Sequence, residues 1–312
     1  HGTAGAELNW FTFVVYRAPT TPGYESGYLQ NNNFRNRMYN FELLALYNNS
    51  WGNFDFNATL GGNLYKVNNQ TIVTTAKDMK IRDVVALMSF NEVSVEPYSY
   101  RKQINSIYGA VNLGWKHMLY FDATLRGDQS STLPISNNMY IYPSFSGSFV
   151  FSELLKLGDK LPYGKVRMSW AQVGSDTDPY QLGLVYTKSK FAYPGYTIGY
   201  ISNGAIPNKD LKPTKTNSFE MGLELKFLKN RIGLDFTYYS QLSKNQIMGM
   251  ASSSTSGYGY RLINAGEIEN KGVEIALNTR PIQTKDFSWD LNFNFSKNSN
   301  KVKKLVDDMD ML

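Results

Sequence analysis

The feature of this sequence that most constrains its fold is a strict alternation of apolar and polar residues, repeated along the chain. In the segment Phe287–Ser296, every odd-numbered side chain is large and apolar, and every even-numbered one is polar. Successive side chains of a β-strand point to opposite faces, so this segment has one apolar face and one polar face. The same alternation marks residues 54–60, 219–227 and 232–239.

The length of these segments separates two kinds of β-structure. Strands of soluble sandwiches usually have about five or six residues, whereas the alternation here continues for roughly ten or more. A tilted strand needs about 9–11 residues to cross the hydrocarbon layer of a membrane. The pattern therefore predicts strands that cross a membrane.

Composition agrees with such strands. The mean hydropathy is −0.38, and no run of apolar residues is long enough for a membrane-spanning helix. Strands that are apolar on one face only average to near-neutral hydropathy. Aromatic residues make up 14% of the chain, with 22 Tyr and 18 Phe, which is typical of a barrel with aromatic girdles at both membrane interfaces.

Breaks at Gly, Pro and Asn divide the chain into strands whose connections alternate between short and long, as in outer-membrane barrels. The predicted strands are 8–17, 34–48, 53–66, 103–115, 118–128, 141–152, 164–174, 217–228, 231–242, 271–281 and 286–297. Between them, helical spacing of apolar residues predicts a short loop helix in Thr75–Phe90, and Glu153–Lys156 predicts one helical turn. Residues 301–308 are expected to begin an outward loop.

An odd number of strands leaves an open sheet edge, which is not tolerated in lipid, and bacterial single-chain barrels have even strand numbers. We therefore expect residues 1–312 to be part of one larger barrel domain. The chain begins at His1 with no signal peptide, although an outer-membrane protein needs one.

Several motifs, in order, resemble the SusC/RagA family of TonB-dependent transporters from Bacteroidetes outer membranes. Departures are Thr214 and Lys215 after Leu-Lys-Pro, where the family usually has Glu, and Thr132 where it usually has an aromatic residue. The matching stretches are Asp122–Ser131, Tyr142–Ser146, Arg167–Gly174, Ile206–Gly222 and Asn264–Glu274.

The resemblance implies an all-β antiparallel transmembrane barrel of about 22 strands with a plugged lumen, located in the outer membrane of a Gram-negative bacterium. It also implies a SusD-like lipoprotein partner and energy input from TonB through an N-terminal plug region. Neither the plug nor the TonB box lies within these residues. The implied function is active import of an oligosaccharide or a peptide.

Two rival functions share part of this pattern. A passive porin-type or autotransporter-type barrel would have the same strands but no plug, and a secreted β-structured adhesin or binding module would be soluble without detergent.

The sequence does not favour an enzyme or a nucleic-acid-binding protein. It has no Cys, and its two histidines, His1 and His117, cannot form a Ser-His-Asp or His-rich metal site. The net charge of +6 comes from basic residues that are scattered among acidic ones. No cofactor is expected. Asp176 and Asp178 resemble part of a calcium loop, although the Gly and Glu that an EF-hand loop needs are missing; a turn is the default interpretation of this segment, and calcium binding by the two carboxylates is the alternative.

Tyrosines in the long loops are the candidate ligand-binding residues. Aromatic rings stack on sugar rings, and a Tyr also offers a hydroxyl group; the alternative is that these rings pack loops onto one another or onto a partner. The candidates are Tyr186, Tyr193, Tyr196, Tyr200, Tyr258 and Tyr260.

Alternation also predicts which side chains face lipid and which face the lumen. The lipid-facing set is Phe54, Phe56, Val111, Leu113, Phe121, Leu125, Phe149, Leu223, Leu225, Phe236, Ile275, Leu277, Leu291 and Phe293. The lumen-facing set is Asp55, Asn57, Asp122, Thr124, Glu220, Glu224, Asp235, Glu274, Asp290 and Asn292.

Overall fold

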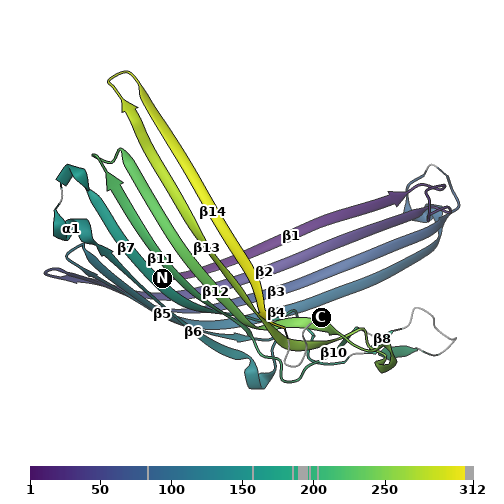
Figure 1. The fold of residues 1–312 in the computed structure, drawn as a ribbon. Coiled ribbons are helices and arrows are strands. Elements are labelled where there is room, and N and C mark those ends of the chain that lie inside the picture. The colour runs from purple at the N-terminus through teal and green to yellow at the C-terminus, as the bar shows by residue number, and fades with distance from the viewer. Residues whose placement is uncertain are drawn as a thin grey trace. The chain divides into compact units, whose positions relative to one another are not determined.

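The computed structural model describes residues 1–82, 84–156, 158–184, 186–188, 196, 198–201 and 204–305, and it is almost entirely β-structure (Figure 1). Twelve strands form one sheet, in which the short β10 (Ala205–Ile206) lies parallel to β13 (Tyr260–Gln283). The pairings given below for the long strands are antiparallel. Among the described residues, no helix is long and apolar enough to cross a membrane.

The long strands alternate with short and long connections, as predicted. Their bounds are β1 Gly2–Arg17, β2 Tyr28–Trp51, β3 Phe54–Met79, β4 Phe90–Trp115, β5 Leu119–Ser130, β6 Met139–Val150, β7 Tyr163–Ser175, β11 Thr214–Phe227, β12 Ile232–Ala251, β13 Tyr260–Gln283 and β14 Ser288–Lys304. The short strands are β8 Tyr186–Lys188, β9 Gly199–Ile201 and β10 Ala205–Ile206, and the one α-helix of the described residues is α1 Phe151–Leu155. Short 3-10 turns are η1 Leu87–Ser89, η2 Ile135–Asn137, η3 Gly158–Lys160 and η4 Ser254–Ser256.

The chain divides into two compact units, which are described separately. The first contains β5 to β14 and the parts of β2, β3 and β4 nearest their short turns; it comprises His1, Leu44–Gly62 and Ser106–Leu312. The second contains β1 and the remaining parts of β2, β3 and β4; it comprises Gly2–Leu43 and Asn63–Asn105.

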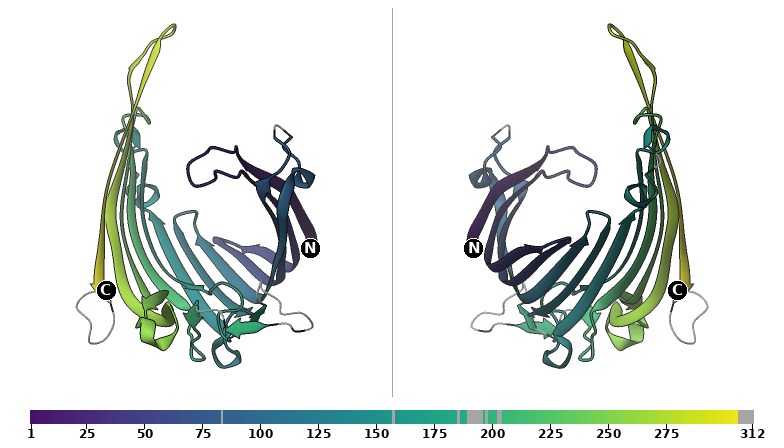
Figure 2. Two further views of the ribbon diagram at one scale, coloured as in Figure 1. Left: turned by 90° about the vertical axis from the view of Figure 1, so that its right-hand side faces the viewer. Right: turned by 90° about the vertical axis from the view of Figure 1, so that its left-hand side faces the viewer.

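In the first unit, strand register confirms the predicted separation of apolar and polar side chains. Directly paired residues of antiparallel strands lie on the same face. One row of paired side chains is apolar across seven strands, and Figure 2 shows the strands of this unit side by side in two further views. The row is Leu119, Phe149, Val166, Leu223, Phe236, Ile275 and Phe295.

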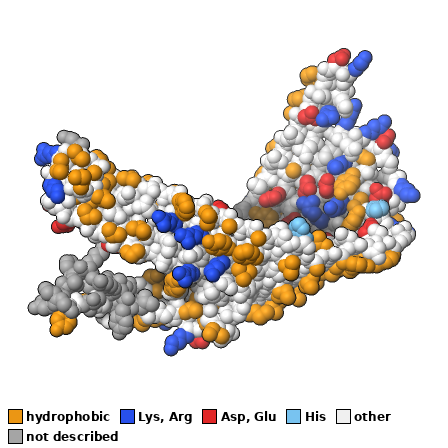
Figure 3. All heavy atoms as spheres, turned by 180° about the vertical axis from the view of Figure 1, so that it is seen from behind, with side chains coloured by type: hydrophobic (Ala, Val, Ile, Leu, Met, Phe, Trp, Pro, Cys, Tyr) orange, Lys and Arg blue, Asp and Glu red, His pale blue; other side chains and the backbone are white. Residues whose placement is uncertain are grey.

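The opposite face of the same strands is polar. A row one position away contains Tyr120, Ser148, Arg167, Gly222, Thr237, Glu274 and Ser296. Figure 3 shows acidic and basic side chains gathered on one surface of these strands and a band of hydrophobic side chains along their lower edge. Register therefore places Glu224 and Asp235 on one face, and Leu223 and Phe236 on the other.

The predicted loop helix in residues 75–90 is wrong. Residues up to Met79 continue β3, β4 begins at Phe90, and only Leu87–Ser89 forms one 3-10 turn. In this hairpin Asn91 donates a hydrogen bond to Asp78 (2.7 Å), and the backbone N–H of Lys80 bonds the carbonyl of Ser89 (2.8 Å). The hydrogen bonds between β3 and β4 thus pair the backbone N–H and C=O groups that would have been paired within the predicted helix.

Other strands also extend past their predicted ends. Residues 243–251 continue β12, and β13 begins at Tyr260, so the connection between them is shorter than predicted. Residues 301–304, which were expected to begin an outward loop, continue β14. The helical turn predicted at 153–156 is confirmed, one to two residues earlier, by α1.

Among the residues that the structure describes, few side chains are fully buried, and these lie near the long-loop ends of the strands. In the first unit, one cluster consists of Leu133, Tyr140, Leu211 and Leu262. In the second unit, another consists of Leu29, Ala76 and Phe90.

Candidate functional site

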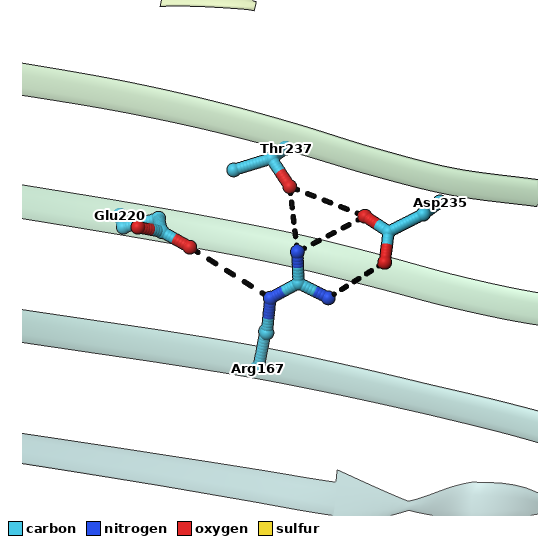
Figure 4. Close-up of polar contacts among 4 residues, drawn as sticks. All are labelled: Arg167, Glu220, Asp235 and Thr237. Atoms are coloured by element: carbon cyan, nitrogen blue, oxygen red, sulfur yellow. Dashed lines mark hydrogen bonds and ion pairs between the residues drawn. The ribbon is translucent and has the colours of Figure 1, made fainter. Parts of the chain in front are cut away.

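An ion-paired cluster lies on the polar face of the strand wall, and we call it the wall cluster (Figure 4). Arg167 of β7 donates two hydrogen bonds to the carboxylate of Asp235 of β12, each 3.0 Å long. The same guanidinium donates to Thr237 Oγ1 (2.6 Å), and its Nε lies 3.7 Å from Glu220 Oε1 of β11. The planar guanidinium fork matches a carboxylate in two-point geometry, so this pairing fixes the side chain across three strands.

A glycine makes room for this arginine. Gly222 of β11 pairs with Arg167 on one side and with Thr237 on the other. A Cβ at position 222 would lie 2.5 Å from the guanidinium carbon of Arg167, which is closer than side chains approach one another. The missing side chain therefore lets the arginine lie flat over β11 and reach β12.

A recess of about 370 Å³ opens beside the wall cluster. Polar groups of four strands, β7, β12, β13 and β14, line it, and Arg167, Asp235 and Thr237 form one side. Its other lining residues are Glu274, Ile275, Ala276, Asn294, Phe295 and Ser296. Carboxylate, guanidinium, amide and hydroxyl groups together offer both donors and acceptors to a hydrated solute.

A second network lies at the long-loop end of the strands, and we call it the rim network. Asp128 of β5 is buried, with 6% of its surface exposed. It accepts hydrogen bonds from the Tyr142 hydroxyl and from Arg126 Nε (2.9 Å), and Arg126 also donates to Ser106 Oγ (2.9 Å). The buried charge is therefore paired and hydrogen-bonded, as buried carboxylates need to be.

The rim network continues into the loop after β5. The hydroxyl groups of Ser130 and Thr132 both donate to Asp176, which follows β7, and they lie 2.9 Å from each other. Both hydroxyl-bearing residues are almost fully buried. These bonds join segments that are distant in sequence, and so they fix the start of the loop against the end of β7.

Apolar contacts support the same rim. Leu211 is fully buried and packs with Leu133, Tyr140 and Leu262. The ring of Tyr140 also covers Gly174, where a Cβ would meet ring atoms at 2.3 Å. The motif segment around Leu211 thus anchors the connection between β7 and β11 to the rim.

Asn264 of β13 clamps the same connection through its side-chain amide. Its Oδ1 accepts from the backbone N–H of Lys212 (2.7 Å), and its Nδ2 donates to the carbonyls of Lys212 (2.7 Å) and Asn245 (3.1 Å). One side chain therefore holds segments from three parts of the chain together, and the family motif that begins at Asn264 has a structural role here.

The candidate tyrosines fall in different places. Tyr196 is exposed and Tyr258 is half-buried in the connection before β13. Tyr260 belongs to β13, not to a loop, and pairs with Ala251. The structure places Tyr186 and Tyr200 in the two-stranded sheet of β8 and β9, on neighbouring register positions. Tyr193 lies outside the described residues.

The proposed calcium ligands are not gathered into a metal site by the described chain. Asp176 is engaged by the two rim hydroxyls, and Asp178 is exposed. Among the described residues, no group of three or more His, Asp or Glu side chains is placed to hold a metal ion.

The sequence placed Glu220 and Asp235 on the lumen face and marked Asp176, but it did not reveal the contacts that join these residues to their partners in the two networks. Arg167 was quoted only as part of a motif, and Thr237 was not singled out. The signal that could have found them was their position in the strand. Arg167 and Glu220 each stand between two apolar residues, so their side chains point to the polar face while those of their neighbours point to the apolar face. The contacts of Ser130 and Thr132 with Asp176 left no local pattern, because their partner is far away in sequence.

Comparison with known proteins gives the family. Residues 3–309 match the family model described as "TonB dependent receptor-like, beta-barrel". The chain is 29% identical over 281 residues to TonB-dependent receptor P3 of Formosa agariphila, covering 86% of this chain and 28% of that protein. It is 30% identical over 223 residues to TonB-dependent receptor SusC of Bacteroides thetaiotaomicron, covering 68% of this chain and 22% of that protein.

Solved structures agree on the fold. A structure of the RagAB peptide importer in the closed-closed state superposes with a TM-score of 0.87 at 22% identity, covering 100% of this chain and 35% of that one. The outer-membrane transporter YddB of Escherichia coli superposes with a TM-score of 0.56 at 12% identity, covering 88% and 34%. The chain spans between a fifth and about a third of the length of these proteins. It belongs to the β-barrel family of TonB-dependent receptors, which are outer-membrane proteins of Gram-negative bacteria.

Proposed function

We propose that this chain forms part of the barrel wall of an active importer in the outer membrane, driven by TonB. The observation that carries the proposal is the two-faced wall, with an apolar row across seven strands on one side and the wall cluster on the other. A wall of this kind separates lipid from a hydrated lumen. Family membership supports the dependence on TonB.

The substrate class in this proposal is an oligosaccharide or a peptide. Tyr196 and Tyr258 stand in the long connections, where aromatic rings can stack on a sugar ring or pack against a peptide side chain. The recess beside Arg167 would accept the hydroxyl or amide groups of either class. One solved relative of similar fold carries the description of a peptide importer.

The proposed partner is a SusD-like surface lipoprotein that closes over the long-loop rim. The similarity to SusC supports this part of the proposal. The rim network and the clamp of Asn264 also support it, since they fix the loops in one arrangement and so lower the conformational entropy that a docking partner would otherwise have to remove. No cofactor is part of the proposal, and calcium at Asp176 and Asp178 stays a prediction.

Uptake by living cells tests the proposal. Cells with the full-length protein should take up a labelled oligosaccharide or peptide that cells lacking the gene do not, and deletion of TonB or addition of a protonophore should abolish this uptake. Uptake that continues without TonB and in the presence of the protonophore would identify a passive porin-type barrel instead. Full-length protein that stays monomeric in buffer without detergent would identify an adhesin or binding module.

A further inference from the structure

Three basic side chains gather on one face of the second unit. Arg35 and Arg37 belong to β2, and Lys66 belongs to β3. Arg35 and Lys66 are exposed and Arg37 is half-buried. Within the part of the chain that the structure describes, none of the three forms an ion pair. Figure 3 shows a patch of Lys and Arg side chains between hydrophobic ones.

Contacts between neighbouring strands assign these cations to one face. On the opposite face of β2 and β3, the Tyr65 hydroxyl donates to Met38 Sδ (3.4 Å) and Asn63 donates to Asn40 Oδ1 (2.7 Å). Because side chains alternate along a strand, residues 35 and 37 of β2 and residues 64 and 66 of β3 lie together on the other face. Register with β1 adds Leu8 opposite Arg37 and Trp10 opposite Arg35.

That face also carries the apolar side chains that meet lipid. Beyond the two arginines and Tyr39, the same side of β2 carries Phe41 and Leu43, with 50% and 71% of their surfaces exposed. Along β3, each second residue from Phe54 to Leu64 is apolar or Gly, and the next residue of that parity is Lys66. A run of this length matches the roughly 9–11 residues that a tilted strand needs to cross the hydrocarbon layer.

The cations therefore stand just past one boundary of the hydrocarbon layer. The short turn between β2 and β3 is at the opposite end of these strands, and short turns of such barrels face the periplasm. The patch consequently lies at the level of the outer-leaflet head groups. This step rests on membership of the family and not on the proposed transport function.

A groove of about 750 Å³ adjoins Arg35 on the same face. Trp10, with 71% of its surface exposed, lines one side, and Thr12, Asn33 and Gln70 contribute hydroxyl and amide groups. An indole with polar neighbours suits the face and the hydroxyl groups of a sugar. Guanidinium and ammonium groups beside it suit phosphate oxygens.

We propose that Arg35, Arg37, Lys66 and Trp10 form a binding site for the phosphorylated head group of an outer-leaflet glycolipid, with lipid A as the occupant. The three cations bind its phosphate groups and Trp10 packs against its sugar, while the acyl chains lie over Phe41, Leu43 and Leu64. Charge complementarity and continuity with the lipid-covered face carry the assignment.

The test is a lipid titration of the full-length protein in detergent micelles, followed by native mass spectrometry. Diphosphorylated lipid A should bind the wild-type protein, and the triple variant R35Q/R37Q/K66Q should bind about 100-fold more weakly, since each basic residue near the head groups contributes roughly fivefold. The matched control K116Q/K229Q/K285Q removes the same charge from the short-turn rim and should bind as the wild type does.

Further arms of the titration separate the sources of phosphate. Dephosphorylated lipid A should bind the wild-type protein as weakly as the phosphorylated lipid binds the triple variant, and millimolar inorganic phosphate should not displace the lipid. Equal binding of lipid A by the triple variant and the control variant, equal binding of the dephosphorylated lipid, or displacement by free phosphate would each overturn the proposal. Heat-modifiable migration in gels confirms that each variant is folded, and Arg35→Gln alone should show about a fivefold loss.

Discussion

The rim network and the wall cluster are both built from charged and hydroxyl side chains, but water reaches them to different extents. In the rim, Ser130 is fully buried, and Thr132 and Asp128 are 2% and 6% exposed. In the wall, the side chains of Arg167 and Asp235 remain 31% and 37% exposed. The rim network is thus part of a small buried core at the long-loop ends of the strands, whereas the wall cluster lies on a partly exposed surface.

This difference indicates separate tasks for the two regions. A buried polar group that loses its partner costs far more than an exposed one, so the rim hydroxyls specify a single loop arrangement. Partly exposed ion pairs contribute little to stability, because water and salt screen them. The wall cluster can therefore exchange its partners for solute or water at low cost, as a lumen surface must.

The largest effect is expected at the apolar centre of the rim. Leu211→Ala should lower the free energy of unfolding by about 2–5 kcal/mol, because it leaves a cavity among Leu133, Tyr140 and Leu262. The measurement is a denaturant titration of the full-length protein in bilayers. Leu228→Ala, at an exposed turn position, is the control and should change stability by less than about 0.5 kcal/mol. Equal effects of the two substitutions would show that the rim is not a packed core.

The two faces of the wall should respond differently to the same charge. Leu223→Arg should cost about 2–4 kcal/mol at the middle of the bilayer, whereas Glu224→Arg next to it should cost much less, because Glu224 faces water. Folding titrations of both variants into lipid bilayers measure the difference. Equal tolerance at positions 223 and 224 would reject the assignment of faces.

The wall was predictable from the sequence because lipid imposes alternation. Every second residue in segments such as 219–227 must be apolar, and this alternation predicted the strands and their two faces. Beyond the membrane both faces of a strand meet water, so residues 67–79 and 90–102 carry no such pattern. There the spacing of Met79, Leu87 and Met88 indicated a helix that the structure does not contain.

The rim was not predictable, because its contacts join residues that are far apart in sequence. Asp176 follows Ser130 by 46 positions, and Lys212 precedes Asn264 by 52. The family motifs marked these segments without giving the contacts. Periodicity can assign a residue to a face of the sheet, but it cannot identify its hydrogen-bonding partner in another loop.

Replacing a polar side chain of the rim network by an apolar one is expected to have an intermediate effect on the free energy of unfolding. Thr132→Val keeps the shape of the side chain but removes the hydroxyl that donates to Asp176 (3.1 Å), leaving a half-buried carboxylate with one donor fewer. The expected cost is about 1–3 kcal/mol. Thr59→Val, which removes a hydroxyl from the polar face of β3, is the control, and thermal unfolding followed by loss of β-sheet circular dichroism compares the two. If Thr132→Val destabilises the protein no more than Thr59→Val does, the rim network does not hold the loops in a single arrangement.

The smallest effect on stability is expected in the wall itself. Arg167→Gln removes the two-point pairing with Asp235 and the contact with Glu220, yet these carboxylates stay in water, so the cost should be about 1 kcal/mol or less. Arg231→Gln, at an exposed turn, is the charge-matched control, and unfolding in bilayers at low and high salt measures both. The difference between them should shrink as salt rises, since screening weakens exposed pairs first. A loss at position 167 as large as that of Thr132→Val, and independent of salt, would mean that the wall cluster is as dry as the rim, and the division of tasks between the two regions would fail.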